Sequence, residues 1–122
     1  MKVFIVDDSA IVRERLVTML SELQEVEIIG QAEDSLEATK SILKLKPDAV
    51  ILDIRMPGGS GIDVLQQIKN HKPAPIVIML TNYPYPQYRK KCLDAGADFF
   101  FDKATEFHEV TAVLEQMIHD SS

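Results

Sequence analysis

The chain alternates short, largely apolar runs with longer segments in which apolar residues recur every three or four positions. Five such runs lie at residues 3–6, 26–31, 49–52, 76–80 and 99–101. An apolar run of this length suits a strand that is buried on both faces, so we predict a strand at each. The run that carries Glu27 is more polar than the others, and we expect it at an edge of the sheet.

The segments that follow these runs have the apolar spacing of amphipathic helices, and we predict five of them. We expect Ser35 to cap the second helix and Leu36 and Ile42 to lie on its buried face. The fourth helix, at 87–95, is expected to be short, because prolines precede it and are tolerated only in a first turn. We expect Thr105 to cap the last helix.

Strands that alternate with helices are typical of a parallel sheet covered by helices on both faces. Right-handed crossover connections limit the strand orders that such a chain can adopt. We therefore predict one α/β domain over residues 1–122, with three layers and a doubly wound sheet. Its five parallel strands are expected in the order 2-1-3-4-5, with five helices.

The composition is that of an ordinary globular domain, with 46% hydrophobic and 26% charged residues among 122. A formal net charge of -6 argues against direct nucleic-acid binding and against binding to an anionic membrane surface. Cys92 is the only cysteine, which excludes an intramolecular disulfide and fits a reducing compartment. The chain shows no signal peptide, and no apolar run approaches the ~20 residues that span a bilayer. We expect a cytoplasmic protein.

Five polar residues share one position, at or just past the carboxyl end of a predicted strand. They are Asp7, Asp8, Asp53, Thr81 and Lys103. In an open doubly wound sheet, ligands bind at this edge, where the strand order reverses. With the predicted order, the reversal falls between the first and third strands, which carry the three aspartates. The topology therefore predicts a site built from residues that are distant in sequence.

Three carboxylates in one cleft repel one another, and a hard divalent cation relieves the repulsion. Mg²⁺ prefers oxygen ligands and is commonly held by one or two carboxylates, water and phosphate oxygens. We expect Asp8 and Asp53 to bind Mg²⁺ directly and Asp7 to bind it through water. The backbone carbonyl of Arg55 is a further expected ligand.

Phosphoryl transfer requires positioning and charge neutralisation more than covalent help from the protein. Asp53 is the predicted nucleophile and phosphoryl acceptor. The ammonium group of Lys103 is expected to neutralise the equatorial phosphoryl oxygens, and the Thr81 hydroxyl to donate a hydrogen bond to one of them.

Taken together, these residues resemble the receiver domain of bacterial two-component response regulators, the CheY-like family, over essentially the whole chain. The matching motifs are the pair Asp7-Asp8, Asp53 with Met-Pro-Gly at 56–58, Thr81, and Lys103. The resemblance implies a flavodoxin-like fold and Mg²⁺-dependent transfer from the phosphohistidine of a sensor histidine kinase, or from a phosphotransfer protein.

The resemblance further implies that the chain is not an enzyme beyond its own phosphorylation and dephosphorylation. Phosphorylation would switch the face of helix 4, strand 5 and helix 5, with Thr81 and Phe100 as switch residues. A downstream protein or an output domain would read that face, and a phosphorylation-dependent dimer is a further expected assembly. The last predicted helix leaves no room for an output domain, so we expect either a stand-alone receiver or the receiver fragment of a DNA-binding transcription factor.

Three features depart from the family pattern. Asn82 stands where a small residue often follows Thr81, and we expect it to crowd the route by which Thr81 moves. Ala104 follows Lys103 where the family usually has proline, often after a cis bond. A cis bond before a non-proline residue costs about 3 kcal/mol, so we expect a trans bond, which would aim Lys103 differently. Arg55 and Tyr83 lie at variable positions beside the site, and we predict that they shield the acyl phosphate from water.

Three other classes of protein remain as alternatives. A haloacid-dehalogenase-type phosphatase also uses an aspartate after a strand, but needs a second aspartate where this chain has Arg55. A flavodoxin-like redox protein needs a phosphate-binding loop after the first strand, and Asp7-Asp8 would repel the phosphate of FMN. An inactive pseudo-receiver would act only as an interaction module, and the intact acidic set and Lys103 argue against it.

Overall fold

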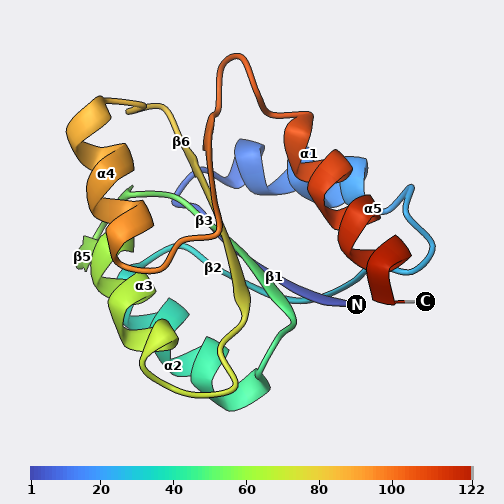
Figure 1. Ribbon diagram of the computed structural model, residues 1–122, viewed down its shortest axis with the longest axis horizontal. Helices are drawn as coiled ribbons and strands as arrows, with labels where there is room; N and C mark the ends of the chain where they lie inside the picture. Colours follow the sequence, from blue (N-terminus) through green and yellow to red (C-terminus); the bar gives the residue numbers. More distant parts are fainter. Residues whose placement is uncertain (122) are drawn as a thin grey trace.

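A five-stranded parallel sheet forms the centre of the molecule in a computed structural model that describes residues 1–121 (Figure 1). Its strands are β1 (Lys2–Val6), β2 (Glu27–Ala32), β3 (Ala49–Leu52), β6 (Ile76–Thr81) and β7 (Phe99–Asp102). They lie in the order β2-β1-β3-β6-β7, and every neighbouring pair is parallel. In chain order this is the predicted 2-1-3-4-5, with β2 at an edge, so the predicted fold class is confirmed.

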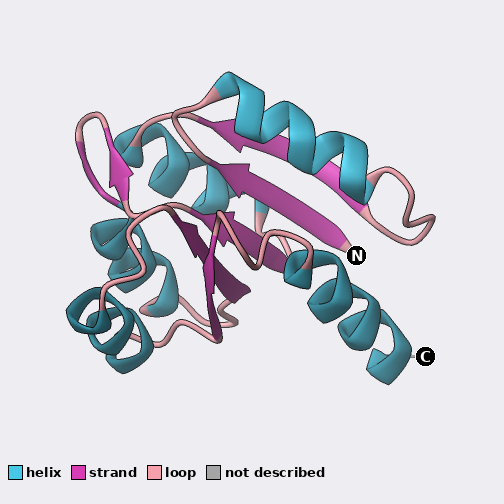
Figure 2. Ribbon diagram, turned by 90° about the horizontal axis from the view of Figure 1, so that it is seen from above, coloured by secondary structure: helices cyan, strands magenta, loops and turns pink. Residues whose placement is uncertain are grey.

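Helices cover both faces of the sheet and complete the three layers (Figure 2). One layer holds α1 (Ala10–Leu20) and α5 (Glu109–Ser121), and the other holds α2 (Ser35–Leu45), α3 (Gly61–Lys69) and α4 (Pro86–Asp94). Each layer has its own apolar cluster, and β1 supplies both, with Phe4 on one face and Ile5 on the other. Burial on both faces explains why the central strands β1, β3 and β6 are largely apolar runs, whereas the edge strand β2 carries exposed polar residues. None of the helices within residues 1–121 is both long enough and apolar enough to cross a membrane.

A small antiparallel hairpin in the loop after β3 was not predicted. Its strands are β4 (Arg55–Met56) and β5 (Gly59–Ser60). Gly58 forms the turn with a φ of 81°, a conformation that side chains disfavour. The hairpin contacts α2, where the backbone N–H of Ser35 donates to the carbonyl of Pro57 at 3.4 Å.

The start of α2 differs from the prediction. Asp34, not Ser35, caps the helix, and its carboxylate accepts from the backbone N–H of Glu37 at 2.8 Å. The buried stripe then consists of Ser35, Ala38 and Ile42. Leu36 lies one residue, or about 100°, away from that stripe and is 78% exposed, so the prediction that it is buried is wrong.

The start of α5 also differs, because Thr105 lies in a turn and the helix begins only at Glu109. Asp102 organises this turn: its carbonyl accepts from the N–H of Glu106 at 2.7 Å and its carboxylate from the N–H of Ala104 at 2.8 Å. These local hydrogen bonds compete with helix formation and delay it.

Candidate functional site

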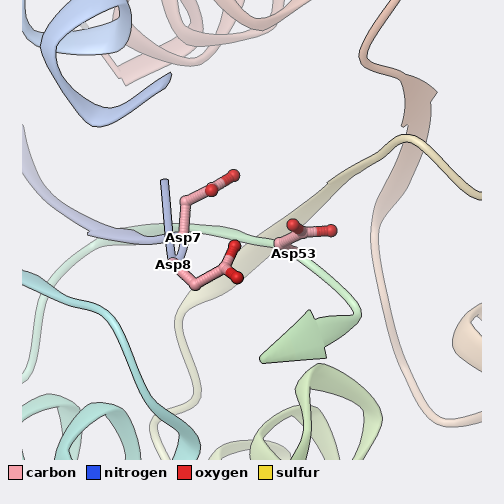
Figure 3. A group of neighbouring side chains, drawn as sticks. All are labelled: Asp7, Asp8 and Asp53. Carbon is pink, nitrogen blue, oxygen red and sulfur yellow. The ribbon is translucent and has the colours of Figure 1, made fainter. Parts of the chain in front are cut away.

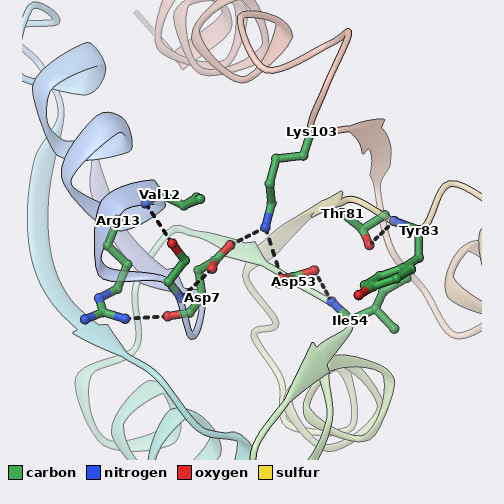
Figure 4. A network of polar contacts seen from close by, with 9 residues as sticks. Asp7, Val12, Arg13, Asp53, Ile54, Thr81, Tyr83 and Lys103 are labelled. Carbon is green, nitrogen blue, oxygen red and sulfur yellow. Dashed lines mark hydrogen bonds and ion pairs between the residues drawn. The ribbon is translucent and has the colours of Figure 1, made fainter.

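Asp7, Asp53 and Lys103 follow three different strands and meet at the carboxyl edge of the sheet (Figure 4). The Nζ atom of Lys103 donates to Asp7 Oδ2 at 2.7 Å and to Asp53 Oδ2 at 3.0 Å. All three residues are buried, with relative exposures of 2%, 5% and 7%. Buried charges of this kind require partners, and here one ammonium group serves two carboxylates.

Asp8 adds a third, exposed carboxylate beside the buried pair (Figure 3). One carboxylate oxygen from each of Asp7, Asp8 and Asp53 lies within 4.8 Å of the others. With Lys103 protonated, the four side chains carry two net negative charges, which one divalent cation balances. The donor set consists of oxygens alone, so these residues fit Mg²⁺ in both charge and chemistry.

The backbone around Asp53 fixes the direction of its carboxylate. The Oδ1 atom accepts from the N–H of Ile54 at 2.7 Å, and the N–H of Asp53 donates to the carbonyl of Val6 at 3.1 Å. The first residue of α3, Gly61, lies so close that a Cβ there would be 1.7 Å from the Asp53 carbonyl oxygen. Only glycine permits this approach of α3 to the end of β3.

Asp7 is held from both its side chain and its carbonyl. Its Oδ1 atom accepts from the N–H of Ser9 at 2.9 Å, and Ser9 in turn caps α1. The Nη1 atom of Arg13 donates to the Asp7 carbonyl at 2.6 Å. The sequence analysis missed Arg13, although its place in the first turn of the helix after the acidic pair was a usable signal.

Burial and neighbouring charges act on the two partners in different ways. Burial raises the pKa of Asp53 above its ordinary value; Lys103 counteracts this, and the charge of Asp7 adds to it. For Lys103, burial favours a lower pKa, but the hydrogen bond to Asp7 and the charge of Asp53 outweigh it, so its pKa is raised. Lys103 therefore stays protonated. Its single positive charge neutralises only one of the three carboxylates.

Thr81 is the last residue of β6 and is fully buried. Its Oγ1 atom accepts from the N–H of Tyr83 at 2.9 Å (Figure 4). Its carbonyl accepts from the N–H of Lys103 at 2.8 Å. The Lys103–Ala104 bond is trans, since the described residues contain one cis peptide, at Lys72–Pro73. The trans bond is as expected, and with it the Nζ atom of Lys103 reaches both carboxylates. A difference in the direction of Lys103 from relatives with a cis bond stays a prediction.

The remaining predicted residues are Arg55 and Phe100, which have no hydrogen bond or ion pair with the three aspartates among residues 1–121. Arg55 is exposed on β4, and its carbonyl as a metal ligand stays a prediction. Phe100 is buried in β7, within the apolar cluster of the α2–α4 layer. Two contacts on α4 were missed: Tyr88 accepts from Arg55 Nη2 at 3.3 Å, and Arg89 Nη1 donates to the Phe100 carbonyl at 3.3 Å. Neither has a sequence signal, because both join segments far apart in the chain.

Comparison with known proteins agrees with this geometry. The family model described as "Response regulator receiver domain" matches residues 3–115. A protein-glutamate methylesterase/protein-glutamine glutaminase 1 of Carboxydothermus hydrogenoformans is 37% identical over 119 residues, which are 96% of this chain but 35% of that protein. The chain spans about a third or less of the length of the curated relatives it matches.

Solved structures agree in fold. The response regulator domain of Thermotoga maritima CheB has a TM-score of 0.85 and 31% identity, covering 98% of this chain and 94% of that one. The receiver domain of the NarL regulator from Mycobacterium tuberculosis has a TM-score of 0.85 and 31% identity, covering 93% of each chain. The chain therefore belongs to the response regulator receiver domain family of two-component signalling.

Proposed function

We propose that this receiver domain accepts a phosphoryl group on Asp53 and passes the change to a downstream partner. The observation that supports it best is the buried ammonium group of Lys103, which donates to both Asp7 and Asp53 while Asp8 lies beside them. The phosphodonor in this proposal is the phosphohistidine of a sensor histidine kinase or of a phosphotransfer protein.

The side chains have separate roles in the transfer. An oxygen of Asp53 attacks phosphorus and forms the new O–P bond, while the P–N bond of the phosphohistidine breaks and the imidazole nitrogen keeps the electron pair. Lys103 neutralises an equatorial phosphoryl oxygen, and the Thr81 hydroxyl, whose oxygen now accepts from Tyr83, donates to another.

The residues that would hold Mg²⁺ are Asp8 and Asp53 directly, Asp7 through water, and Arg55 through its carbonyl. When bound, the ion supplies the positive charge that the three carboxylates lack. The charge balance and the all-oxygen donor set support this assignment.

The chain itself is proposed to turn over only its own aspartyl phosphate. The methylesterase activity named for the relatives belongs to proteins about three times as long. The partner that reads the phosphorylated state is either a separate protein or an output domain, as in a DNA-binding transcription factor. A phosphorylation-dependent dimer is a further form of this output.

Labelling by acetyl phosphate tests the acceptor role. We expect the protein to take up one phosphoryl group when Mg²⁺ is present and none when EDTA removes it, as measured by intact mass. Asp53→Asn should abolish uptake, whereas Asp94→Asn, which changes an exposed carboxylate on α4, should leave it intact. A wild-type protein that takes up no label in Mg²⁺ would instead be an interaction module without phosphotransfer.

We further propose that Thr81 and Phe100 couple phosphorylation to the face formed by α4, β7 and α5. They lie on the adjacent strands β6 and β7, where Thr81 pairs with Asp102. Movement of Thr81 towards a phosphoryl group would open space into which Phe100 turns. Phe100→Ala should leave labelling intact but remove the phosphorylation dependence of partner binding. Equal phosphorylation dependence in this variant would contradict the coupling.

A further inference from the structure

Arg55 is a charged residue beside the acceptor aspartate that contacts aromatic rings instead of a carboxylate. Its Cζ atom lies 3.9 Å from the ring centre of Tyr83 and 6.0 Å from that of Tyr88. Its Nη2 atom donates to the hydroxyl of Tyr88 at 3.3 Å. Among residues 1–121 no carboxylate forms an ion pair with it.

The two tyrosines connect Arg55 to different parts of the molecule. Tyr83 lies in the loop after β6, and its N–H donates to the hydroxyl oxygen of Thr81. Tyr88 lies in α4 and packs against the apolar cluster beneath it. Arg55 therefore connects the hairpin that follows Asp53 to α4, a helix whose Tyr88 lies 33 residues further along the chain.

We propose that Arg55 is a second sensor of the phosphoryl group and that it leaves Tyr88 when Asp53 is phosphorylated. This inference rests on the proposed function, since it needs an anionic group on Asp53. In the unphosphorylated chain the guanidinium group ties α4 to the hairpin. In the phosphorylated chain it binds oxygens of the phosphoryl group on Asp53, two residues earlier in the sequence, and the hydrogen bond to Tyr88 on α4 is lost.

The competition between the two acceptors favours the phosphoryl group. The Tyr88 hydroxyl is neutral, and its 3.3 Å contact is long for a hydrogen bond. A phosphoryl group offers charged oxygens that a planar guanidinium group can bind with two parallel N–H bonds. Movement of Thr81 also removes the acceptor of the Tyr83 N–H, which loosens the ring on which Arg55 stacks.

By thermodynamic linkage, the proposal predicts opposite effects on phosphorylation for the loss of the Tyr88 hydroxyl and the loss of the Arg55 guanidinium. A contact made only in the unphosphorylated chain opposes phosphorylation, so removing the Tyr88 hydroxyl should favour the phosphorylated form. A contact made only to the phosphoryl group supports it, so removing the Arg55 guanidinium should disfavour that form.

The test measures the affinity of the protein for beryllofluoride, which mimics a tetrahedral phosphoryl group when a carboxylate oxygen binds it, in the presence of Mg²⁺ by ¹⁹F NMR titration. We expect Tyr88→Phe to raise the affinity about threefold, because it deletes only the hydroxyl acceptor. Arg55→Met should lower the affinity about tenfold. In the Arg55→Met background, Tyr88→Phe should have no effect.

Tyr85→Phe is the matched control, because its ring lies 5.8 Å from that of Tyr88, whereas the Arg55 Nη2 atom donates to the Tyr88 hydroxyl. It should bind beryllofluoride like the wild type. An unchanged affinity in Tyr88→Phe, or an effect that persists without Arg55, would overturn the inference while leaving the acceptor role of Asp53 intact. Failure of the wild type to bind beryllofluoride in Mg²⁺ would overturn the proposed function itself.

Discussion

Asp53 is a buried carboxylate that shares a single ammonium group with a second buried carboxylate. Burial is the largest influence on it and raises its pKa, despite the opposing effect of Lys103. Ionisation of Asp53 is therefore less favourable in the folded chain without metal than in the unfolded chain. A residue kept for chemistry at the expense of stability is a common property of functional sites.

The substitution Asp53→Asn should stabilise the metal-free protein. It removes the buried charge, and Lys103 keeps its 2.7 Å contact with Asp7. We expect the free energy of unfolding at pH 7 in EDTA to rise by about 1 kcal/mol. In millimolar Mg²⁺ the order should reverse, because the ion stabilises only the protein that binds it. Urea unfolding followed by circular dichroism measures both.

The difference in the free energy of unfolding between Asp53→Asn and the wild type should depend on pH in a defined direction. Because the pKa of Asp53 is raised on folding, the folded chain binds a proton there more tightly than the unfolded chain does. The ionised Asp53 carboxylate lowers the free energy of unfolding by its full amount at pH values above the pKa of the folded chain. This loss of stability disappears as the pH falls through that pKa. The advantage of Asp53→Asn in EDTA should therefore shrink at acid pH, and an advantage that grows there would contradict this account.

Arg55 and Tyr83 also act at this scale, through a stacked contact of 3.9 Å beside Asp53. We predict that this pair shields the acyl phosphate, so replacing both with alanine should shorten its half-life about threefold or more, by admitting water. Loss of label from the acetyl-phosphate-treated protein gives the half-life. Tyr85→Ala serves as the control, and an unchanged half-life in the double variant would reject the shield.

At the scale of elements, the central strands β1, β3 and β6 could be predicted from sequence because burial on both faces leaves an apolar run, and the edge strand β2 was recognised by its more polar run. The run at 49–52 coincides with β3. The predicted strand order also places the carboxyl ends of β1 and β3 next to each other, as the structure does. The helix starts were harder to predict, because Asp34 and Ser35 are both favourable capping residues. Only the structure shows that the Asp34 carboxylate accepts the capping hydrogen bond. The β4–β5 hairpin is too short to leave a periodic pattern.

Asp98 joins several elements at the edge of the sheet opposite the site. Its Oδ2 atom accepts from the N–H of Val77 and from Nζ of Lys69, each at 2.8 Å, and Lys69 also donates to the Pro75 carbonyl. Asp98→Ala leaves the Val77 N–H and the Lys69 ammonium without this acceptor. We expect a loss of about 1–3 kcal/mol in the free energy of unfolding, measured in urea.

The control for this prediction is Asp94→Ala, which removes an exposed pair with Lys90 on α4. It should change stability by less than about 0.5 kcal/mol. Labelling by acetyl phosphate should be retained in Asp98→Ala, because the affected contacts lie away from the carboxylates. Equal stability of the two variants would mean that the Asp98 contacts contribute nothing measurable.

At the scale of the whole molecule, a groove runs between α1 and the segment that follows Lys103. It has a volume of about 690 Å³ and is lined by residues of both, including Met19 and Phe107. Ile11 lines it as well and is 73% exposed, two residues after Ser9 at the mouth of the site. An exposed apolar side chain that follows the Asp7–Asp8 pair by three residues is suited to contact an incoming phosphodonor protein.

Ile11→Asp should therefore slow phosphotransfer from a histidine kinase about tenfold, by removing apolar contact and adding charge. The kinase would be chosen by profiling the wild type against a panel. Labelling by acetyl phosphate, which needs no protein contact, should be unchanged. Leu36→Asp is the control, since Leu36 is 78% exposed on the opposite layer. Equal slowing by both substitutions would exclude a specific role for this groove.

This groove and the Arg55 contacts could not be predicted from the sequence. Both arise where segments far apart in the chain meet, such as α1 with residues 104–108, and neither has a local pattern. The carboxylates and Lys103 were accessible to prediction because strand ends share one edge of a parallel sheet. Side-chain packing across layers has no such simple rule.

The three neighbouring tyrosine rings of the loop after β6 and of α4 have an optical consequence. The chain contains no tryptophan, and Tyr83, Tyr85 and Tyr88 are all of its tyrosines. Their ring centres lie 6.3 Å and 5.8 Å apart along the series. The near-ultraviolet fluorescence of the unmodified protein therefore originates in this one corner, so a fluorimeter can follow events there in real time without an attached dye.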